Sequence, residues 1–348
     1  NSADEMEYPD TSCLQDLFWA TAKKYPERIA LIDGTTEKQW TYAELDVQTD
    51  KFASFLSNEH GVRPGDIVGI LLNRSPEFVI AYIAILKAGG AYMPLELSYP
   101  NDLLDRAITE GEAISVLTTS EYAPRLAPSV KRLLMEGDWL DRLPANLPEM
   151  PEGGFQPKPT IDDRAYMVMS SGTTGQPKGI MCPHRGSVFN YYHRAQTYPL
   201  ESDHREGMGV FMTWECFRPF LSGGTAVTIH DTVLFNPEKL TSLIARMKLT
   251  RMLFTPSLLQ LVLDSLPHEV VSERMKSMKL LWLCGEVVSV PMAQLFRNTC
   301  PTCKLLNLYS ISECHDTNIA DLSKIDTVKF PEYAPCGVSI PNTKCFIL

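Results

Sequence analysis

The stretch YMVMSSGTTGQPKGI, residues 166–180, decides the fold of this chain of 348 residues. Its first four residues predict a short buried strand. The next ten combine glycines, hydroxyl side chains and Lys178, and such a loop can turn its backbone N–H groups toward an anion. It is not a Walker loop, because Lys178 is followed by Gly179 where that loop has Ser or Thr. A phosphate-binding loop and a polar surface turn both fit this composition.

Strand-like and helix-like stretches alternate on both sides of the loop. Thr41 and Glu44 form a capping box that predicts a helix reaching about residue 58. Ser75 and Pro76 start another helix, after an apolar strand at 67–72. This alternation favours an α/β fold in which crossover helices join parallel strands. We expect further helices at 184–196 and 237–248, and further strands at 251–254, 280–284 and 305–309.

A proline- and glycine-rich stretch, LPANLPEMPEGGFQPKP at 143–159, interrupts this alternation. A chain of 348 residues exceeds what one hydrophobic core usually holds. We therefore expect two subdomains, at about 1–150 and 160–348, joined by this stretch as a linker.

Composition excludes several classes of protein. Hydrophobic residues make up 44% and charged residues 21%, as in globular proteins, and the net charge of −10 argues against nucleic-acid binding through a basic surface. The apolar run at 78–86 is too short to span a membrane. The acidic, polar start does not resemble a secretory signal, and nine cysteines favour a reducing, cytoplasmic compartment. Cys300 and Cys303 are interpreted as two thiols on a surface connection, not as a metal or redox pair.

Four stretches together resemble the adenylate-forming superfamily of acyl-CoA ligases, luciferases and adenylation domains of nonribosomal peptide synthetases. The loop at 166–180 is the most specific of them. WTYAEL at 40–45 and LKAGGAYMPLE at 86–96 resemble the first two motifs of the adenylation domains, with Glu96 in place of Asp. NLYSISE at 307–313 resembles the aromatic-x-x-Thr-Glu motif. The resemblance implies the N-terminal core of this superfamily: two α/β subdomains with mostly parallel sheets, plus a small distorted β-barrel.

The superfamily also has a small C-terminal lid with an aspartate for the ribose, a hinge and a lysine for the reacting carboxylate. Those motifs do not occur in this sequence, so we expect a core that lacks the lid. Such a core should bind nucleotide but form adenylate poorly by itself.

The resemblance further implies ATP-dependent activation of a carboxylate as an acyl adenylate, followed by loading on the phosphopantetheine thiol of a carrier domain. Lys178, Ser312 and Glu313 would be the catalytic residues. Lys178 would contact the β- and γ-phosphates, Ser312 the α-phosphate, and Glu313 would bind Mg²⁺, which prefers carboxylate oxygens. Tyr309 would stack on adenine, although a buried core tyrosine is the alternative. The other nucleotide-binding positions implied are Ser170, Ser171, Gly172, Thr173, Thr174, Gly175, Gly285, Glu286, Val287, Asn307 and Ser310.

The acid pocket can be located in the same way. Adenylation domains for α-amino acids pair an aspartate with the substrate ammonium, and alignment on Trp214 and Glu215 puts that position at Val210. A valine cannot form this pair, so an ordinary α-amino acid is disfavoured. The other positions that would face the substrate are Phe211, Trp214, Leu253, Trp282, Cys284, Leu308 and Asp316. Three of these are aromatic, and aromatic faces attract quaternary ammonium groups. Alternatively, Trp214 and Trp282 serve the core alone.

Several strings, among them LFTPSLL, CGEVV and NLYSISECHD, resemble adenylation domains of carboxylic acid reductases, in particular those that act on glycine betaine. A quaternary-ammonium acid is therefore the leading substrate, with Asp316 as its counter-charge. A β- or ω-amino acid paired with Asp316, and an aryl or acyl acid, are the alternatives. The carrier domain is expected on the same polypeptide, and neither nucleic acid nor membrane is expected as a partner. An acyl-CoA ligase and a non-catalytic nucleotide-binding module stay open as other functions.

Overall fold

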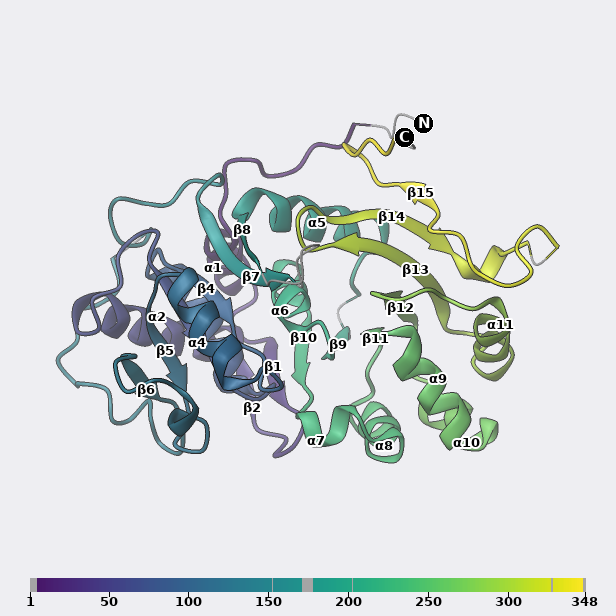
Figure 1. Cartoon of the computed structure of the whole chain (residues 1–348), viewed down its shortest axis with the longest axis horizontal. Helices are drawn as coiled ribbons and strands as arrows, with labels where there is room; N and C mark the ends of the chain where they lie inside the picture. Colours follow the sequence, from purple (N-terminus) through teal and green to yellow (C-terminus); the bar gives the residue numbers. More distant parts are fainter. Residues whose placement is uncertain (1–4, 152, 171–177, 202, 327, 347–348) are drawn as a thin grey trace. The chain divides into compact units, whose positions relative to one another are not determined.

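The computed structural model describes residues 5–151, 153–170, 178–201, 203–326 and 328–346. The chain forms two compact units. The six-strand unit comprises Pro9–Arg28 and Trp40–Phe189, and the nine-strand unit comprises Asn1–Tyr8, Ile29–Gln39 and Asn190–Leu348. Both alternate strands with helices, as the sequence predicts (Figure 1).

The six-strand unit is built on a sheet in the order β6-β5-β3-β4-β7-β8. The pairs among β3 to β7 are parallel, and β7 and β8 are antiparallel. The strands are β3 Ile67–Ile70, β4 Ala91–Pro94, β5 Ala113–Thr118, β6 Arg132–Leu134, β7 Arg164–Ser170 and β8 Lys178–Pro183. The helices of this part of the chain are α1 Leu14–Lys24, α2 Tyr42–Asn58, α3 Pro76–Lys87, α4 Asn101–Glu110 and α5 His184–Thr197, of which α5 continues into the nine-strand unit.

Helix α2 begins where the capping box predicts it. The N–H of Glu44 donates to Thr41 Oγ1 at 3.1 Å, and the N–H of Thr41 donates to Glu44 Oε2 at 2.8 Å. These two bonds satisfy donors that a helix start would otherwise leave unpaired. The predicted end of the helix near residue 58 is also confirmed.

The nine-strand sheet has the order β15-β14-β13-β12-β11-β9-β10-β1-β2. The pairs from β1 to β13 are parallel, and β13, β14 and β15 pair antiparallel. The strands are β1 Ile29–Asp33, β2 Gln39–Thr41, β9 Arg205–Met208, β10 Thr225–Thr228, β11 Arg251–Phe254, β12 Leu280–Cys284, β13 Lys304–Ile311, β14 His315–Asp321 and β15 Val338–Ser339. The helices are α6 Met212–Glu215, α7 Asp231–Leu234, α8 Pro237–Met247, α9 Pro256–Ser265, α10 His268–Arg274 and α11 Val290–Thr299.

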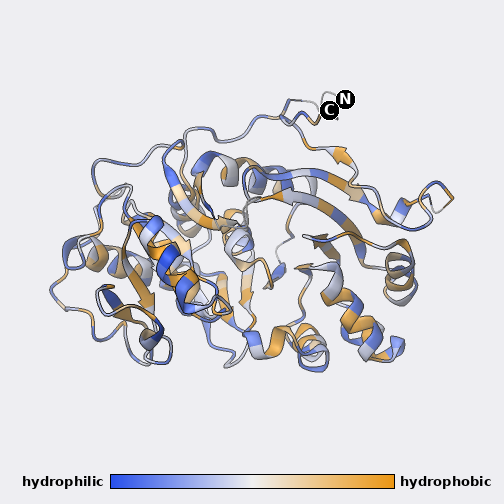
Figure 2. Ribbon diagram, in the orientation of Figure 1, coloured by the Kyte–Doolittle hydropathy of each residue, from blue (hydrophilic) through white to orange (hydrophobic). Residues whose placement is uncertain are grey.

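The two faces of this sheet carry different side chains, because successive residues of a strand point to opposite faces. One face belongs to a large core with α8 to α11, and it includes Leu281 and Leu283 of β12. The other face carries a smaller group that we call the pocket cluster: Leu253, Leu280, Trp282, Cys284, Leu306 and Leu308. Figure 2 shows hydrophobic and hydrophilic residues side by side on helix α4, as expected for a helix with one face in water.

The division between the units differs from the expected one. Residues 143–159 stay within the six-strand unit, where Ser54 Oγ of α2 donates to the carbonyl oxygen of Pro148 at 2.6 Å. The chain instead changes unit around β1 and at Phe189/Asn190. Composition marks 143–159 as an irregular connection, but it does not reveal which sheet a distant strand will join.

One further expectation is corrected. Cys300 and Cys303 are each 5% exposed and belong to the large core, where burial raises the pKa of the Cys300 thiol to about 11. They are packing residues because the turn between α11 and β13 lies against that core. The described strands form two sheets, as expected for two α/β subdomains.

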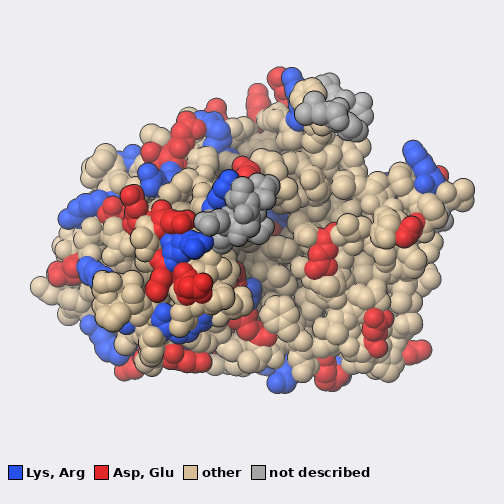
Figure 3. All heavy atoms as spheres, viewed as in Figure 1, with Lys and Arg blue, Asp and Glu red and all other residues tan. Residues whose placement is uncertain are grey.

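Two observations bear on the expected partners. Within the described ranges, no helix combines the length and the apolar character needed to cross a membrane. Figure 3 shows many acidic and basic side chains intermixed on one part of the face that it draws, whereas the rest of that face is mostly uncharged. This mixed surface accompanies a net charge of −10.

Candidate active site

The predicted phosphate loop follows a strand, as expected. Strand β7 ends at Ser170, strand β8 begins at Lys178, and these two residues pair in antiparallel register. Lys178 is exposed. Five of the expected nucleotide contacts, Ser171, Gly172, Thr173, Thr174 and Gly175, lie outside the described residues.

The predicted adenine and metal motif forms the turn of the β13–β14 hairpin. Tyr309 is 48% exposed, so it is not the buried core tyrosine that an apolar strand would also allow. The register shifts between Tyr309 and Ser310, and such an irregularity redirects side chains at the end of a strand. Glu313 is exposed in the turn and Ser312 is half-buried. An exposed ring and an exposed carboxylate are thus four residues apart on one hairpin.

Asn307 differs from its neighbours in this motif. It is 6% exposed, and its Nδ2 donates to the carbonyl oxygen of Pro335 at 2.9 Å. In this structure its amide therefore fixes a nearby chain segment.

The segment 285–287 follows β12 and requires glycine at its first position. Gly285 has φ of +88°, and a Cβ there would lie 2.8 Å from Cζ of Phe211. Glu286 accepts hydrogen bonds from the N–H and Oγ of Ser257, both at 2.8 Å, at the start of α9. Val287 is 70% exposed. Of the three predicted contacts, Gly285 thus lets the backbone approach Phe211, and Glu286 holds a helix end.

Most of the predicted acid-pocket residues gather in one place. Leu253, Trp282, Cys284 and Leu308 belong to the pocket cluster, and the half-buried Phe211 packs against it. The ring of Trp214, also half-buried, meets that of Phe211 edge-on, with centroids 6.1 Å apart. Val210 packs against the large core instead.

A residue that the sequence analysis did not find, Arg194 of α5, organises the polar side of this cluster. Its Nε and Nη2 donate to the two carboxylate oxygens of Asp316, at 2.5 and 2.8 Å. Its guanidinium carbon lies 4.7 Å from the ring centroid of Trp282. Arg194 is 2% exposed, Trp282 1% and Asp316 6%. The expected counter-charge and one expected cage wall therefore both contact an arginine of the chain itself.

One signal in the sequence could have pointed to this arginine. Asn190 and Arg194 are four residues apart, so on a helix they share a face. Asn190 Oδ1 accepts from the N–H of Asp316 at 3.1 Å, so both side chains of this pair bind Asp316. The partner lies more than a hundred residues away, and spacing alone does not identify it.

Further buried charged residues surround Arg194. Glu215 Oε1 accepts from Arg194 Nη1 at 3.3 Å and from Arg218 Nη2 at 2.7 Å. Arg218 Nη1 lies 4.0 Å from Glu206 Oε1. Arg251 donates to the carbonyl oxygens of Tyr198 and Pro199, both at 2.6 Å. We call this group the ionic network: Arg194, Arg218, Arg251, Glu206, Glu215 and Asp316.

Burial dominates the titration of the ionic network. It raises the pKa of Glu206 to about 7, although Arg251 and Arg194 oppose the shift, and it raises the pKa of Glu215 well above its usual value. Neither oxygen of Glu206 accepts a hydrogen bond from a described residue. Burial also opposes the charge of Arg194, but Asp316 and Glu215 outweigh it and hold its pKa above the ordinary value. A charge with so little access to water depends on its partners.

Glu313 is the residue expected to bind Mg²⁺. Over the part of the chain that the structure describes, no cluster of three His, Cys, Asp or Glu side chains could hold a metal ion alone. Mg²⁺ in phosphate chemistry usually takes one or two protein carboxylates and completes its shell with substrate oxygens and water. Glu313 carries a carboxylate of this kind, and it is exposed.

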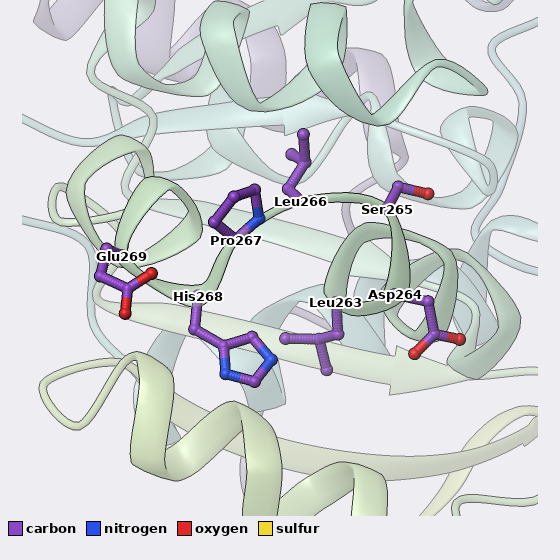
Figure 4. A pocket seen from close by; sticks show the side chains of 7 residues that line it. All are labelled: Leu263, Asp264, Ser265, Leu266, Pro267, His268 and Glu269. Carbon is purple, nitrogen blue, oxygen red and sulfur yellow. The ribbon is translucent and has the colours of Figure 1, made fainter.

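A separate hollow of about 470 Å³ lies at the turn between α9 and α10. Its lining residues are Leu263, Asp264, Ser265, Leu266, Pro267, His268 and Glu269 (Figure 4). None of the expected site residues is among them.

The sequence profile of the AMP-binding enzyme family matches residues 18–348. The chain therefore belongs to the AMP-binding enzymes, the adenylate-forming superfamily. The predicted family and fold class are confirmed.

Two curated relatives illustrate this membership. The chain is 34% identical over 338 residues to glycine betaine reductase ATRR of Emericella nidulans, covering 97% of the chain and 26% of that protein. It is 32% identical over 352 residues to tyrocidine synthase 3 of Brevibacillus parabrevis, covering 98% of the chain and 5% of that protein. The chain thus spans about a quarter or less of these relatives.

Solved structures agree on the fold. The nonribosomal peptide synthetase FmoA3 bound to α-methyl-L-serine-AMP has a TM-score of 0.84 at 22% identity, over 97% of this chain and 37% of that one. The N-terminal subdomain of Klebsiella oxytoca NpsA in complex with 3-hydroxybenzoyl-AMSN has a TM-score of 0.81 at 20% identity, over 95% of this chain and 80% of that one. At these identities the likeness shows the fold alone.

Proposed function

We propose that this chain activates a small quaternary-ammonium acid, with glycine betaine as the best candidate, for loading on a carrier domain of the same polypeptide. The family establishes the coarser activity, which is adenylate-forming activation of a carboxylic acid with ATP. The observation that carries the substrate proposal is the half-buried pair of rings, Phe211 and Trp214. The position at which domains for α-amino acids carry an aspartate holds Val210, whose side chain packs against the large core.

In this proposal the carboxylate oxygen attacks the α-phosphorus of ATP, the bond to pyrophosphate breaks, and the acyl adenylate forms. Lys178 binds the β- and γ-phosphates together with the backbone and hydroxyls of the loop at 170–175, and Ser312 donates to the α-phosphate. Tyr309 stacks on one face of adenine, and the backbone of 285–287 lies against the other face. Asn307 and Ser310, which belong to β13 with Tyr309, complete the nucleotide site. Glu313 holds Mg²⁺, which would offset the charge that builds on the phosphate oxygens.

The head group of the acid lies against Phe211 and Trp214. Each cation–π contact contributes about 0.5–2 kcal/mol, and a trimethylammonium group leaves no N–H unsatisfied. Leu253, Cys284 and Leu308 complete the apolar wall. Trp282 and Asp316 act on the head group only indirectly, because Arg194 contacts both side chains. The name of the relative from Emericella nidulans, glycine betaine reductase, supports this choice of acid.

The test is ATP–pyrophosphate exchange on the complete polypeptide, with glycine betaine, glycine, β-alanine and benzoate compared. Exchange with betaine and not with glycine is expected. Preference for glycine or β-alanine would contradict the pocket proposal, preference for benzoate would indicate an aryl acid, and silence with every acid would favour a non-catalytic nucleotide-binding module. Phe211→Ala and Trp214→Ala should raise the KM for betaine about tenfold each. Phe235→Ala, at a ring that is 55% exposed, is the matched control.

A second assay addresses the carrier domain. After incubation with ATP and betaine, the phosphopantetheine arm of the complete polypeptide should carry a thioester that mass spectrometry detects. Release of a CoA thioester when free CoA is added would instead indicate an acyl-CoA ligase.

A further inference from the structure

Arg194 already occupies the position that an ammonium group of the substrate would need in order to use Asp316. Both oxygens of that carboxylate accept hydrogen bonds from the guanidinium, at 2.5 and 2.8 Å. The same guanidinium lies over the ring of Trp282, at 4.7 Å. One side chain thus neutralises the acid and covers the aromatic face beside it.

This arrangement is held from several directions. Arg194 is 2% exposed, and its remaining terminal nitrogen contacts Glu215, which is bound in turn by Arg218. The N–H of Asp316 donates to Asn190, one helical turn before Arg194. Displacing the guanidinium would leave the buried carboxylate of Asp316 without its cation, which is strongly unfavourable.

We propose that Arg194 is a specificity-determining residue of the acid pocket, which excludes acids that carry a primary ammonium group by keeping Asp316 occupied. This rests on the proposed function of the same pocket. A primary ammonium has three N–H donors that need acceptors after burial, whereas a trimethylammonium has none. With Asp316 taken, the pocket favours a cation that is satisfied by aromatic faces over a β- or ω-amino acid.

The test measures exchange by the complete polypeptide carrying Arg194→Ala, with betaine, β-alanine and benzoate as acids. Removing the guanidinium frees Asp316 for an ammonium group of the substrate. The ratio of kcat/KM for β-alanine to that for benzoate should rise about tenfold or more, because a hydrogen-bonded charge pair contributes that much. Arg194→Lys is the matched control, since its ammonium can still pair with Asp316, and it should give no such gain. In Arg194→Ala/Asp316→Asn the gain should disappear.

A second variant keeps the proposal testable if Arg194→Ala does not fold. In Asp316→Asn the kcat/KM values for betaine and benzoate should change by the same factor, because Asp316 does not touch the acid. A loss of about tenfold for betaine alone would place Asp316 against the substrate cation and overturn the proposal.

The remaining outcomes separate this proposal from the proposed function. Exchange by the wild type with betaine, but no gain for β-alanine in a folded Arg194→Ala, overturns the role of Arg194 alone. Exchange by the wild type with β-alanine overturns it as well, and a Glu206→Gln variant that loses β-alanine alone would then locate the ammonium at Glu206. Silence of the wild type with every acid overturns the proposed function itself.

Discussion

Side chains near the turn of the β13–β14 hairpin fall into two groups that differ sharply in their exposure to water. In the exposed group, Tyr309 is 48% exposed and Glu313 is exposed. In the closed group, Asp316, which pairs with Ser310 beside the turn, is 6% exposed and both its oxygens are bonded to Arg194. The exposed group can take a ligand directly, whereas the closed group is occupied by charges of the chain itself. Nucleotide recognition would therefore depend on exposed side chains that contact the ligand, and acid recognition on a buried ion pair of the chain.

The largest expected effect is on the closed group. Arg194→Ala should lower the free energy of unfolding by about 3–5 kcal/mol, because it leaves Asp316 buried without its cation and removes one of the two cations that contact Glu215. Urea denaturation of the folded chain measures this. Arg246→Ala is the control, since Arg246 pairs with Glu37 on the surface and such pairs contribute about 0–1 kcal/mol. Equal losses in the two variants would show that the ionic network contributes no more than a surface pair.

The next effect is on the exposed group. Glu313→Gln should reduce kcat for ATP–pyrophosphate exchange about 10²-fold while leaving stability nearly unchanged, because the side chain is exposed and its proposed role is to bind Mg²⁺. Raising the Mg²⁺ concentration should restore part of the activity. Glu273→Gln removes a comparably exposed carboxylate far from the motif and serves as the control. Normal exchange by Glu313→Gln would exclude this carboxylate as the metal ligand.

Gly285 concerns both nucleotide and acid recognition, since it begins the segment proposed for adenine and its backbone lies against Phe211. Gly285→Ala should cost about 1–3 kcal/mol of stability, through the positive φ and the 2.8 Å approach to Phe211. In exchange assays it should raise the KM for the acid more than the KM for ATP. Combining Gly285→Ala with Phe211→Ala removes the clash with the ring, so the double variant should be more stable than Gly285→Ala alone. If it is not, the loss of stability comes from the positive φ alone.

A smaller effect follows from the pKa of Glu206, which burial raises to about 7. Between its ordinary pKa and about 7 the folded state binds more protons than the unfolded state. Stability should therefore fall as pH rises through this window, with a slope on the order of 1 kcal/mol per pH unit. Glu206→Gln should flatten the pH dependence of unfolding. An unchanged slope would assign the effect to other groups, with Glu215 as the first candidate.

Local signals in the sequence predicted much of the fold. The bonds between Thr41 and Glu44 start α2 within three residues of chain, and the apolar runs at 251–254 and 280–284 form strands where predicted. The family motifs also indicated residues that lie close together, since Phe211 packs against the cluster that contains Trp282. Each of these depends on neighbours in sequence or on a pattern shared with a family.

Long-range pairing set the limit of prediction. The partner of Arg194 is 122 residues away, and nothing local distinguishes Asp316 from a free carboxylate. The unit boundary was misplaced for the same reason, because β1 joins a strand formed almost two hundred residues later. Patterns of polarity show that a residue will be buried, but not which opposite charge will be buried with it.

The placement of β1 also bears on how the chain is made. Leu31 lies opposite Ala226 in a parallel pair, while the residues between them include most of the six-strand unit. On a ribosome that adds about 5–20 residues per second, β1 waits roughly 10 to 40 seconds before its neighbour in the sheet exists. During that time its apolar residues, Ala30, Leu31 and Ile32, lack the partner strand that buries them. The nascent chain therefore exposes an unpaired apolar segment while most of the six-strand unit is synthesised. Such a segment is prone to aggregate, and we expect chaperones to bind it during synthesis.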